Sequence, residues 1–106
     1  MIDVKDNIIF LKAIASLPKQ QAIGILKCAS SPQVIVICQI AKNVLANNLK
    51  IKEKYKGILK RQRNVIRSLA QSKLSHKKRS ALIANNTLSV ISLVQAVIDT
   101  LKALTK

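Results

Sequence analysis

Lysines and arginines are the residues of this sequence that most clearly could do chemistry. Twelve of the 19 lie between Lys50 and Arg79, and Glu53 is the only acidic residue in that interval. A cluster of like charges attracts an oppositely charged partner, and each cation that meets a phosphate releases condensed counterions. The segment 50–79 therefore predicts binding to a polyanion.

The cations within 52–72 recur at spacings of three and four residues, which places them on one face of a helix. A second stripe, apolar except for Gln62, alternates with them: Tyr55, Ile58, Leu59, Gln62, Ile66 and Leu69. The predicted nucleic-acid contacts are Lys52, Lys56, Lys60, Arg61, Arg63, Arg67, Lys73, Lys77, Lys78 and Arg79. Their expected role is charge neutralisation, with Lys56, Lys60, Arg63 and Arg67 first.

A lysine-rich helix face can also be an ordinary solvated surface. Such faces usually intersperse glutamate with lysine, whereas this stripe has almost no acidic partners, which favours binding. Only Gln62 and Asn64 accompany the stripe as candidates for reading bases. We therefore predict sequence-independent binding to nucleic acid, DNA in the first place. The rival interpretation is a helical interaction module that docks an acidic protein.

The sequence offers little for catalysis or for metal binding. His76 is the only histidine and has no neighbouring carboxylate, and the four acidic residues are scattered. Cys28 and Cys38 lack further ligands at metal spacing, so both are predicted to be buried, reduced thiols. We expect no enzyme, no cofactor and no metal.

The apolar periodicity predicts an all-α fold, a compact bundle of five to six short helices in a single domain over residues 1–106. The expected helices span about 4–16, 18–29, 31–47, 52–72, 76–85 and 88–104. The expected start signals are Asp3 with Asp6, Pro18, Ser31 with Pro32, Ser75 and Thr87. The cations of Lys77, Lys78 and Arg79 would then lie at the positive end of a helix dipole, which favours a nearby anion.

The C-terminal helix over 88–104 is apolar on more than one face and must be buried in some way. The first, second, third and last helices are expected to build the core. The last helix could also mediate homo-oligomer or membrane contact through Ile91, Val94 and Ile98. Its interruption by Ser89, Ser92, Gln95 and Asp99 makes the membrane alternative the weaker one.

No uncharged run approaches the roughly 18 residues of a membrane span, and the N-terminus carries Asp3 and Asp6 instead of a basic leader. We therefore expect a soluble intracellular protein, not a secreted one.

A set of local patterns between Leu17 and Leu82 recurs in a known family. They are Leu-Pro with a short Ile-Leu-Lys helix over 17–27, a Cys-containing helix ending in 44–48, a Lys/Arg-rich helix over 52–67 followed by Ser-Leu-Ala, and the segment 73–79. This arrangement resembles the small basic proteins of Maverick/Polinton elements and adintoviruses, which are likened to the adenovirus X (mu) core protein. The resemblance covers about two thirds of the chain.

The resemblance implies a viral or transposon-encoded protein that condenses DNA in a virion, located in the nucleus or the virion. The family usually continues with a Gly-Gly-Phe-Leu junction into a hydrophobic tail. This chain has Asn85-Asn86-Thr87-Leu88 at that place, so the resemblance does not extend to the tail.

Overall fold

The chain folds into short helices joined by brief connections. A computed structural model describes residues 7–46, 50–71 and 73–104, with side chains up to Thr100. Within those ranges there are seven helices and no strand, so the all-α prediction is confirmed and the predicted number of five to six helices is too low. The helices are α1 Ile8–Ser16, α2 Lys19–Lys27, α3 Ser31–Leu45, α4 Glu53–Arg61, α5 Arg63–Leu69, α6 His76–Asn85 and α7 Thr87–Leu104.

The start of α3 follows from a reciprocal pair of side-chain bonds. The Gln33 backbone N–H donates to Ser30 Oγ at 3.4 Å, and the Ser30 N–H donates to Gln33 Oε1 at 2.9 Å. This capping box satisfies two backbone donors that a helix end leaves unpaired, while Pro32 lies in the first turn. The cap is therefore Ser30, not the predicted Ser31. Similarly, Pro18 precedes α2 instead of lying inside it.

The largest departure from the predicted elements is at Gln62, which divides the expected helix 52–72 into α4 and α5. Its φ of −102° and ψ of 17° leave the helical range, and its N–H is shared between the carbonyls of Ile58 and Leu59, both at 3.2 Å. On either side of this break, α4 packs against α7 and α5 packs against α3 and α6. The different packing partners give the physical reason for two helices.

The C-terminal elements agree more closely with the sequence. Ser75 Oγ accepts from the Lys78 N–H at 3.3 Å at the start of α6, as predicted. The chain bends by 93° between α6 and α7 at Asn86, whose carbonyl accepts the Val90 N–H at 3.1 Å. The residue that precedes α7 is therefore Asn86, not the predicted Thr87. Thr87 is the first residue of α7. The predicted caps Asp3 and Asp6 and the predicted end at 47–48 lie outside the described residues.

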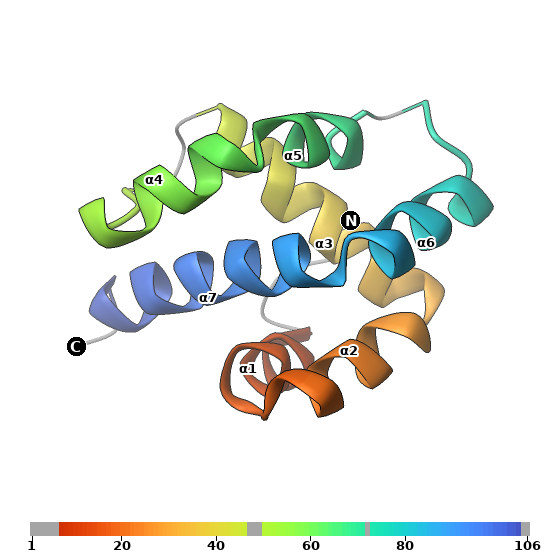
Figure 1. Cartoon of the computed structure of the whole chain (residues 1–106), viewed down its shortest axis with the longest axis horizontal. Helices are drawn as coiled ribbons and strands as arrows, with labels where there is room; N and C mark the ends of the chain where they lie inside the picture. Colours follow the sequence, from red (N-terminus) through yellow and green to blue (C-terminus); the bar gives the residue numbers. More distant parts are fainter. Residues whose placement is uncertain (1–6, 47–49, 72, 105–106) are drawn as a thin grey trace.

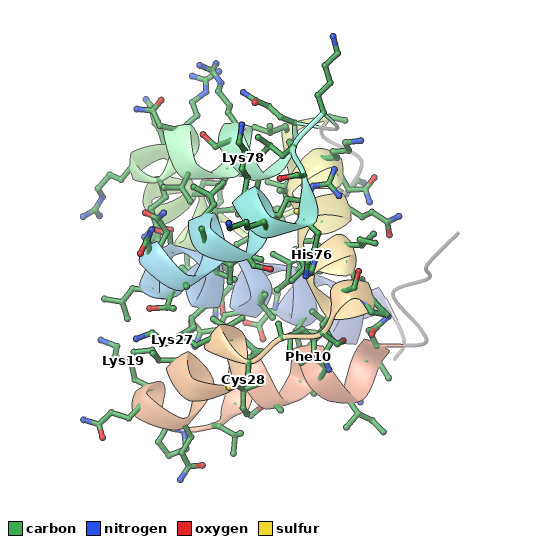
Figure 2. The ribbon with its side chains drawn as sticks, turned by 90° about the vertical axis from the view of Figure 1, so that its right-hand side faces the viewer. Phe10, Lys19, Lys27, Cys28, His76 and Lys78 are labelled. Carbon is green, nitrogen blue, oxygen red and sulfur yellow. The ribbon has the colours of Figure 1, made fainter. Side chains whose placement is uncertain are left out.

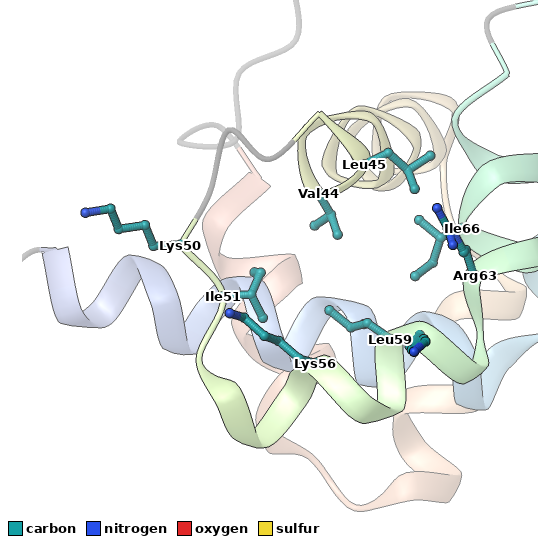
Figure 3. Close-up of a pocket in the computed structure, with 9 residues that line it drawn as sticks. Val44, Leu45, Lys50, Ile51, Lys56, Leu59, Arg63 and Ile66 are labelled. Atoms are coloured by element: carbon teal, nitrogen blue, oxygen red, sulfur yellow. The ribbon is translucent and has the colours of Figure 1, made fainter.

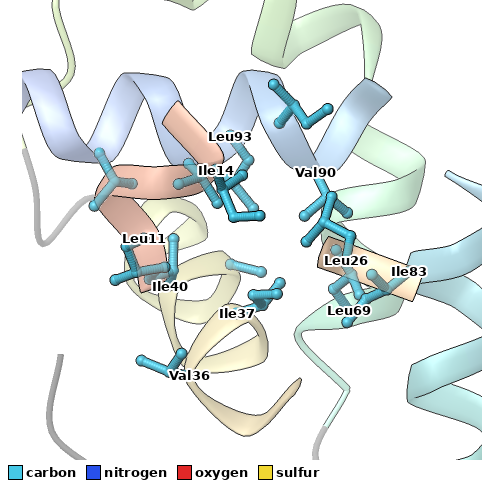
Figure 4. Close-up of a cluster of buried hydrophobic side chains, with 14 of the residues drawn as sticks. Leu11, Ile14, Leu26, Val36, Ile37, Ile40, Leu69, Ile83, Val90 and Leu93 are labelled. Atoms are coloured by element: carbon cyan, nitrogen blue, oxygen red, sulfur yellow. The ribbon is translucent and has the colours of Figure 1, made fainter. Parts of the chain in front are cut away.

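The core gathers around α7. Figure 1 shows α7 across the middle of the molecule, with α1 and α2 below it, α4 and α5 above it and α3 crossing behind. Leu11 and Ile14 of α1, Ile37 of α3 and Leu93 of α7 are fully buried and meet in one cluster (Figure 4). The radius of gyration of 12.5 Å fits the roughly 13 Å of a compact domain of this length.

The predicted contact residues of the last helix belong to this core. Ile91, Val94 and Ile98 are 7%, 0% and 2% exposed. In this fold they pack inside the molecule and are not presented to a second chain or to a membrane. The first, second, third and last helices contribute to the core as predicted, but α4, α5 and α6 also contribute, which the prediction left out; their core residues are Leu59, Ile66, Leu69 and Ile83.

Candidate nucleic-acid interface

Helix α4 carries its cations on a face that the core leaves open. Its single buried residue is Leu59, and Tyr55, one turn earlier, is half-buried toward the same side. Residues four apart lie on the same face of a helix, so Tyr55 and Leu59 mark the side that faces inward. Lys52, just before the helix, and Lys56, Lys60 and Arg61 are consequently exposed.

A polar contact fixes α4 to α7. The Tyr55 hydroxyl donates to Asp99 Oδ2 at 2.5 Å, and Lys54 Nζ lies 3.4 Å from the same oxygen. The bond to the Asp99 carboxylate, with smaller contributions from burial and from its charge, raises the pKa of Tyr55 to about 12. The same bond, with help from Lys54 and against the effect of burial, lowers the pKa of Asp99. The contact therefore holds the basic helix against the core.

Helix α5 continues the same surface. Ile66 and Leu69 are buried, at 2% and 1% exposure, and pack toward α3 and α6. Arg63 and Arg67, four residues apart, are exposed. The cations of the predicted stripe are therefore exposed on both sides of the break at Gln62.

The connection to α6 and the first turn of α6 add three more exposed cations, Lys73, Lys77 and Lys78. Figure 2 shows Lys78 on the upper half of the molecule, whereas Lys19 and Lys27 lie on the lower half with α2. Arg79 differs from the other predicted contacts because it is half-buried and its Nη2 donates to the Gln71 carbonyl at 3.5 Å. It holds the connecting segment to α6.

Nine of the ten predicted contacts are thus exposed, on three successive helices and their connections. We call these nine the basic surface: Lys52, Lys56, Lys60, Arg61, Arg63, Arg67, Lys73, Lys77 and Lys78. Within it, Lys56 Nζ contacts Glu53 Oε1 at 2.8 Å, an exposed pair that contributes little. The basic surface therefore keeps a large excess of positive charge.

A hollow beside the basic surface was not predicted. It has a volume of about 700 Å³ and lies between the end of α3, the segment before α4, and the helices α4 and α5. In Figure 3 the side chains of Val44, Leu45, Ile51, Leu59 and Ile66 point toward one another around it. Lys50, Lys56, Lys60 and Arg63 complete its lining. The sequence gives no signal for it because its walls come from three separate segments.

The two cysteines and the histidine differ in their exposure to solvent. Cys38 is buried in α3, and desolvation raises the pKa of its thiol against the opposing charges of Arg79 and Lys42. Cys28 is exposed, so the prediction that both thiols are buried is wrong for Cys28, which lies just past the end of α2. His76 is exposed, with Nε2 at 3.4 Å from Ser80 Oγ.

Among the described residues, no group of three or more potential ligands is placed to hold a metal ion. In the same part of the chain, no single helix meets the length and hydropathy of a membrane span. Two bent helix pairs, α2 with α3 and α6 with α7, do so only when taken together.

Comparison with known proteins adds no assignment, because no family model, curated protein or solved structure matches this chain. The interface is therefore interpreted from its own geometry and charge.

Proposed function

We propose that this protein binds the phosphate backbone of nucleic acid through its basic surface and does so without regard to sequence. The observation that carries the proposal is the exposure of nine cations on α4, α5, α6 and the segments that precede α4 and α6, in a stretch with one acidic residue. A phosphate backbone supplies a continuous row of negative charges for such a surface. The role is one of binding, not of catalysis.

The polar side chains near the basic surface support backbone contact over base reading. Base recognition generally uses the amide groups of Asn or Gln, or paired arginine contacts inside a groove. The Gln62 side chain is half-buried, and its Oε1 is enclosed without a hydrogen-bond partner in the described structure. Asn64 is exposed and is the single remaining amide from the predicted pair. Phosphate contacts position a protein but carry no sequence information.

Duplex DNA is the form of nucleic acid that we propose first. The near absence of aromatic residues, Phe10 and Tyr55 alone, removes the stacking platforms that single strands require. Phe10 is buried in α1, and Tyr55 is engaged with Asp99. The resemblance of residues 17–82 to small basic core-type proteins points to the same partner and to a packaging role in a virion.

The test measures the affinity for a labelled random-sequence duplex at a series of salt concentrations, with fluorescence anisotropy as the readout. We expect log K to fall with log salt with a slope of at least about five. A variant with Lys56, Lys60, Arg63 and Arg67 replaced by glutamate should lose most of this slope. The matched control places glutamate at Lys12, Lys19, Lys27 and Lys42, four exposed cations on α1, α2 and α3.

The two variants change the net charge equally, so the control separates a defined surface from diffuse attraction. Retention of binding by the control alone supports the proposal. Equal weakening of both variants would contradict it. An undetectable affinity of the unaltered protein at low salt would also reject it and would favour an acidic protein as partner.

A further inference from the structure

The hollow beside the basic surface combines two chemistries that nucleic acid binding does not need together. Five of its lining residues are aliphatic and four are cationic. A phosphate backbone uses the cations but has no aliphatic part that would enter an apolar depression. The apolar lining therefore fits a different ligand.

The lining residues constrain what that ligand is. Leu45 is 38% exposed, and Val44 and Ile51 are half-buried, so apolar surface remains open to water inside the hollow. Covering such surface with an aliphatic chain is favourable in proportion to the area removed from water. Lys60 of α4 and Arg63 of α5 add cationic groups to a lining that also contains Val44 and Leu45 at the end of α3. The ligand must then be apolar along its length and anionic at one end.

The size of the hollow favours a small molecule over a protein. Its volume of about 700 Å³ falls within the roughly 300–1,000 Å³ of ligand pockets. Nine residues line it, whereas a stable protein interface uses about 20–30 residues on each side.

We infer that the hollow binds a free long-chain fatty acid. The carboxylate contacts Arg63, whose planar guanidinium matches a carboxylate with two parallel hydrogen bonds, and Lys60 adds charge. The alkyl chain lies against Val44, Leu45, Ile51, Leu59 and Ile66 (Figure 3). Because Lys56, Lys60 and Arg63 belong both to this site and to the basic surface, bound fatty acid also weakens duplex binding.

The experiment uses cis-parinarate, a fatty acid whose fluorescence rises in an apolar environment, at concentrations below its micelle range. We expect saturable binding of one probe per chain, displaced by oleate and not by methyl oleate, which lacks the carboxylate. Dihexanoyl phosphatidylglycerol, a soluble anionic phospholipid used below its micelle range, should not displace it.

Two exposed leucines make a matched pair of variants. Leu45 and Leu17 are both 38% exposed, but only Leu45 lines the hollow. We expect Leu45→Gln to weaken probe binding about ten-fold, because a polar amide replaces part of the apolar wall, and Leu17→Gln to leave it unchanged. Arg63→Gln should weaken it by about ten-fold or more, since a charge-assisted hydrogen bond is lost.

The result distinguishes this site from the proposed nucleic-acid surface. Leu45→Gln should leave duplex affinity unchanged. The fatty-acid inference can therefore be rejected while duplex binding is supported, and duplex binding can be rejected while the inference is supported. Absence of saturable probe binding, equal effects of Leu45→Gln and Leu17→Gln, or displacement by methyl oleate as strong as by oleate would each overturn the inference. Displacement by the soluble phospholipid as strong as by oleate would overturn it in favour of a membrane lipid.

Discussion

Helices α3 and α4 are neighbours in the sequence but are built on opposite plans. Helix α3 runs for 15 residues, begins with a reciprocal cap and buries six side chains. Helix α4 runs for nine residues, lacks a side-chain cap and buries only Leu59. The first is held by its surroundings on most sides, whereas the second rests on the core by one leucine and the Tyr55–Asp99 bond.

Apolar burial and exposed positive charge are therefore concentrated in different parts of the chain. Apolar burial is the main source of stability, so α3 and α7 carry the fold. The cations of α4 mostly stay in water, where their mutual repulsion costs little and where a partner can reach them. Changes in the two regions should therefore have separable effects.

The largest expected effect comes from the core helix. Ile37→Ala removes a fully buried side chain of α3 and should lower the free energy of unfolding by about 3 kcal/mol, through lost burial and a residual cavity. The same change at Ile58 of α4, which is 36% exposed, should cost less than about 1 kcal/mol. Urea denaturation followed by circular dichroism measures both. Similar losses at the two positions would show that α4 is as firmly held as α3.

The contact between α4 and α7 gives the next largest effect. Tyr55→Phe removes the donor to Asp99 and should lower the free energy of unfolding by about 1.5 kcal/mol at neutral pH. Because the pKa of Tyr55 is raised from 10.0 to about 12, its contribution is present below about pH 10 and is lost as the pH rises through about 12. The unfolding free energies of the two proteins should converge over that interval. A difference that does not change with pH would show that the bond is not responsible.

The same contact also predicts behaviour in acid. The pKa of Asp99 is lowered from 3.8, so its contribution is present above that value and is lost as the pH falls through the lowered one. Asp99→Asn should therefore flatten part of the acid dependence of stability. Acid titrations of the unaltered protein and of Asp99→Asn, followed by circular dichroism, would reveal it. Identical titration curves would count against the contact.

The helix caps allow a finer comparison. The double variant Ser30→Ala/Gln33→Ala removes both side-chain bonds of the capping box of α3 and should cost about 1 kcal/mol of stability. Ser75→Ala removes a single bond at the start of α6 and should cost less. Thermal denaturation of the two variants tests the order. A larger effect at Ser75 would place more of the fold's stability in the basic half of the molecule.

The smallest effect on stability is expected at a cation of the basic surface. Lys60→Ala should change the free energy of unfolding by no more than about 0.5 kcal/mol, because the side chain is exposed. It should lower the salt slope of duplex binding by about one, as the loss of one phosphate contact requires. Lys27→Ala on α2 is the control, and its slope should stay unchanged. A stability loss that tracks the affinity loss would show that the two roles are not separated.

Sequence patterns predicted the helices where strong local signals lie. Ser75 and Asn85 mark α6 correctly, because a hydroxyl cap and paired asparagines act within a few residues. The break at Gln62 has no such signal, since neither proline nor glycine stands there. It arises from the separate packing of α4 on α7 and of α5 on α3, which no local pattern reports.

The candidate site likewise has features that local sequence predicted and features that depend on the tertiary structure. Exposure of the basic stripe followed from helical periodicity, and Lys56, Lys60, Arg63 and Arg67 are all exposed. The engagement of Arg79 with the Gln71 carbonyl depends on how the connecting segment folds back. The hollow depends on side chains from 44–45, 50–51 and 56–66 meeting in space, so its existence required the tertiary structure.

The unequal positions of the two thiols provide a practical route to site-specific labelling. The thiolate is the reactive form of cysteine, and Cys38 is both enclosed and raised in pKa, whereas Cys28 is exposed. A maleimide dye should therefore attach to Cys28 in the folded chain without any substitution. Because α2 lies across α7 from α4 and α5 (Figure 1), that dye can report binding without covering the cations of α4 and α5. Slower reaction at Cys38 would then record the rate at which the core opens to solvent.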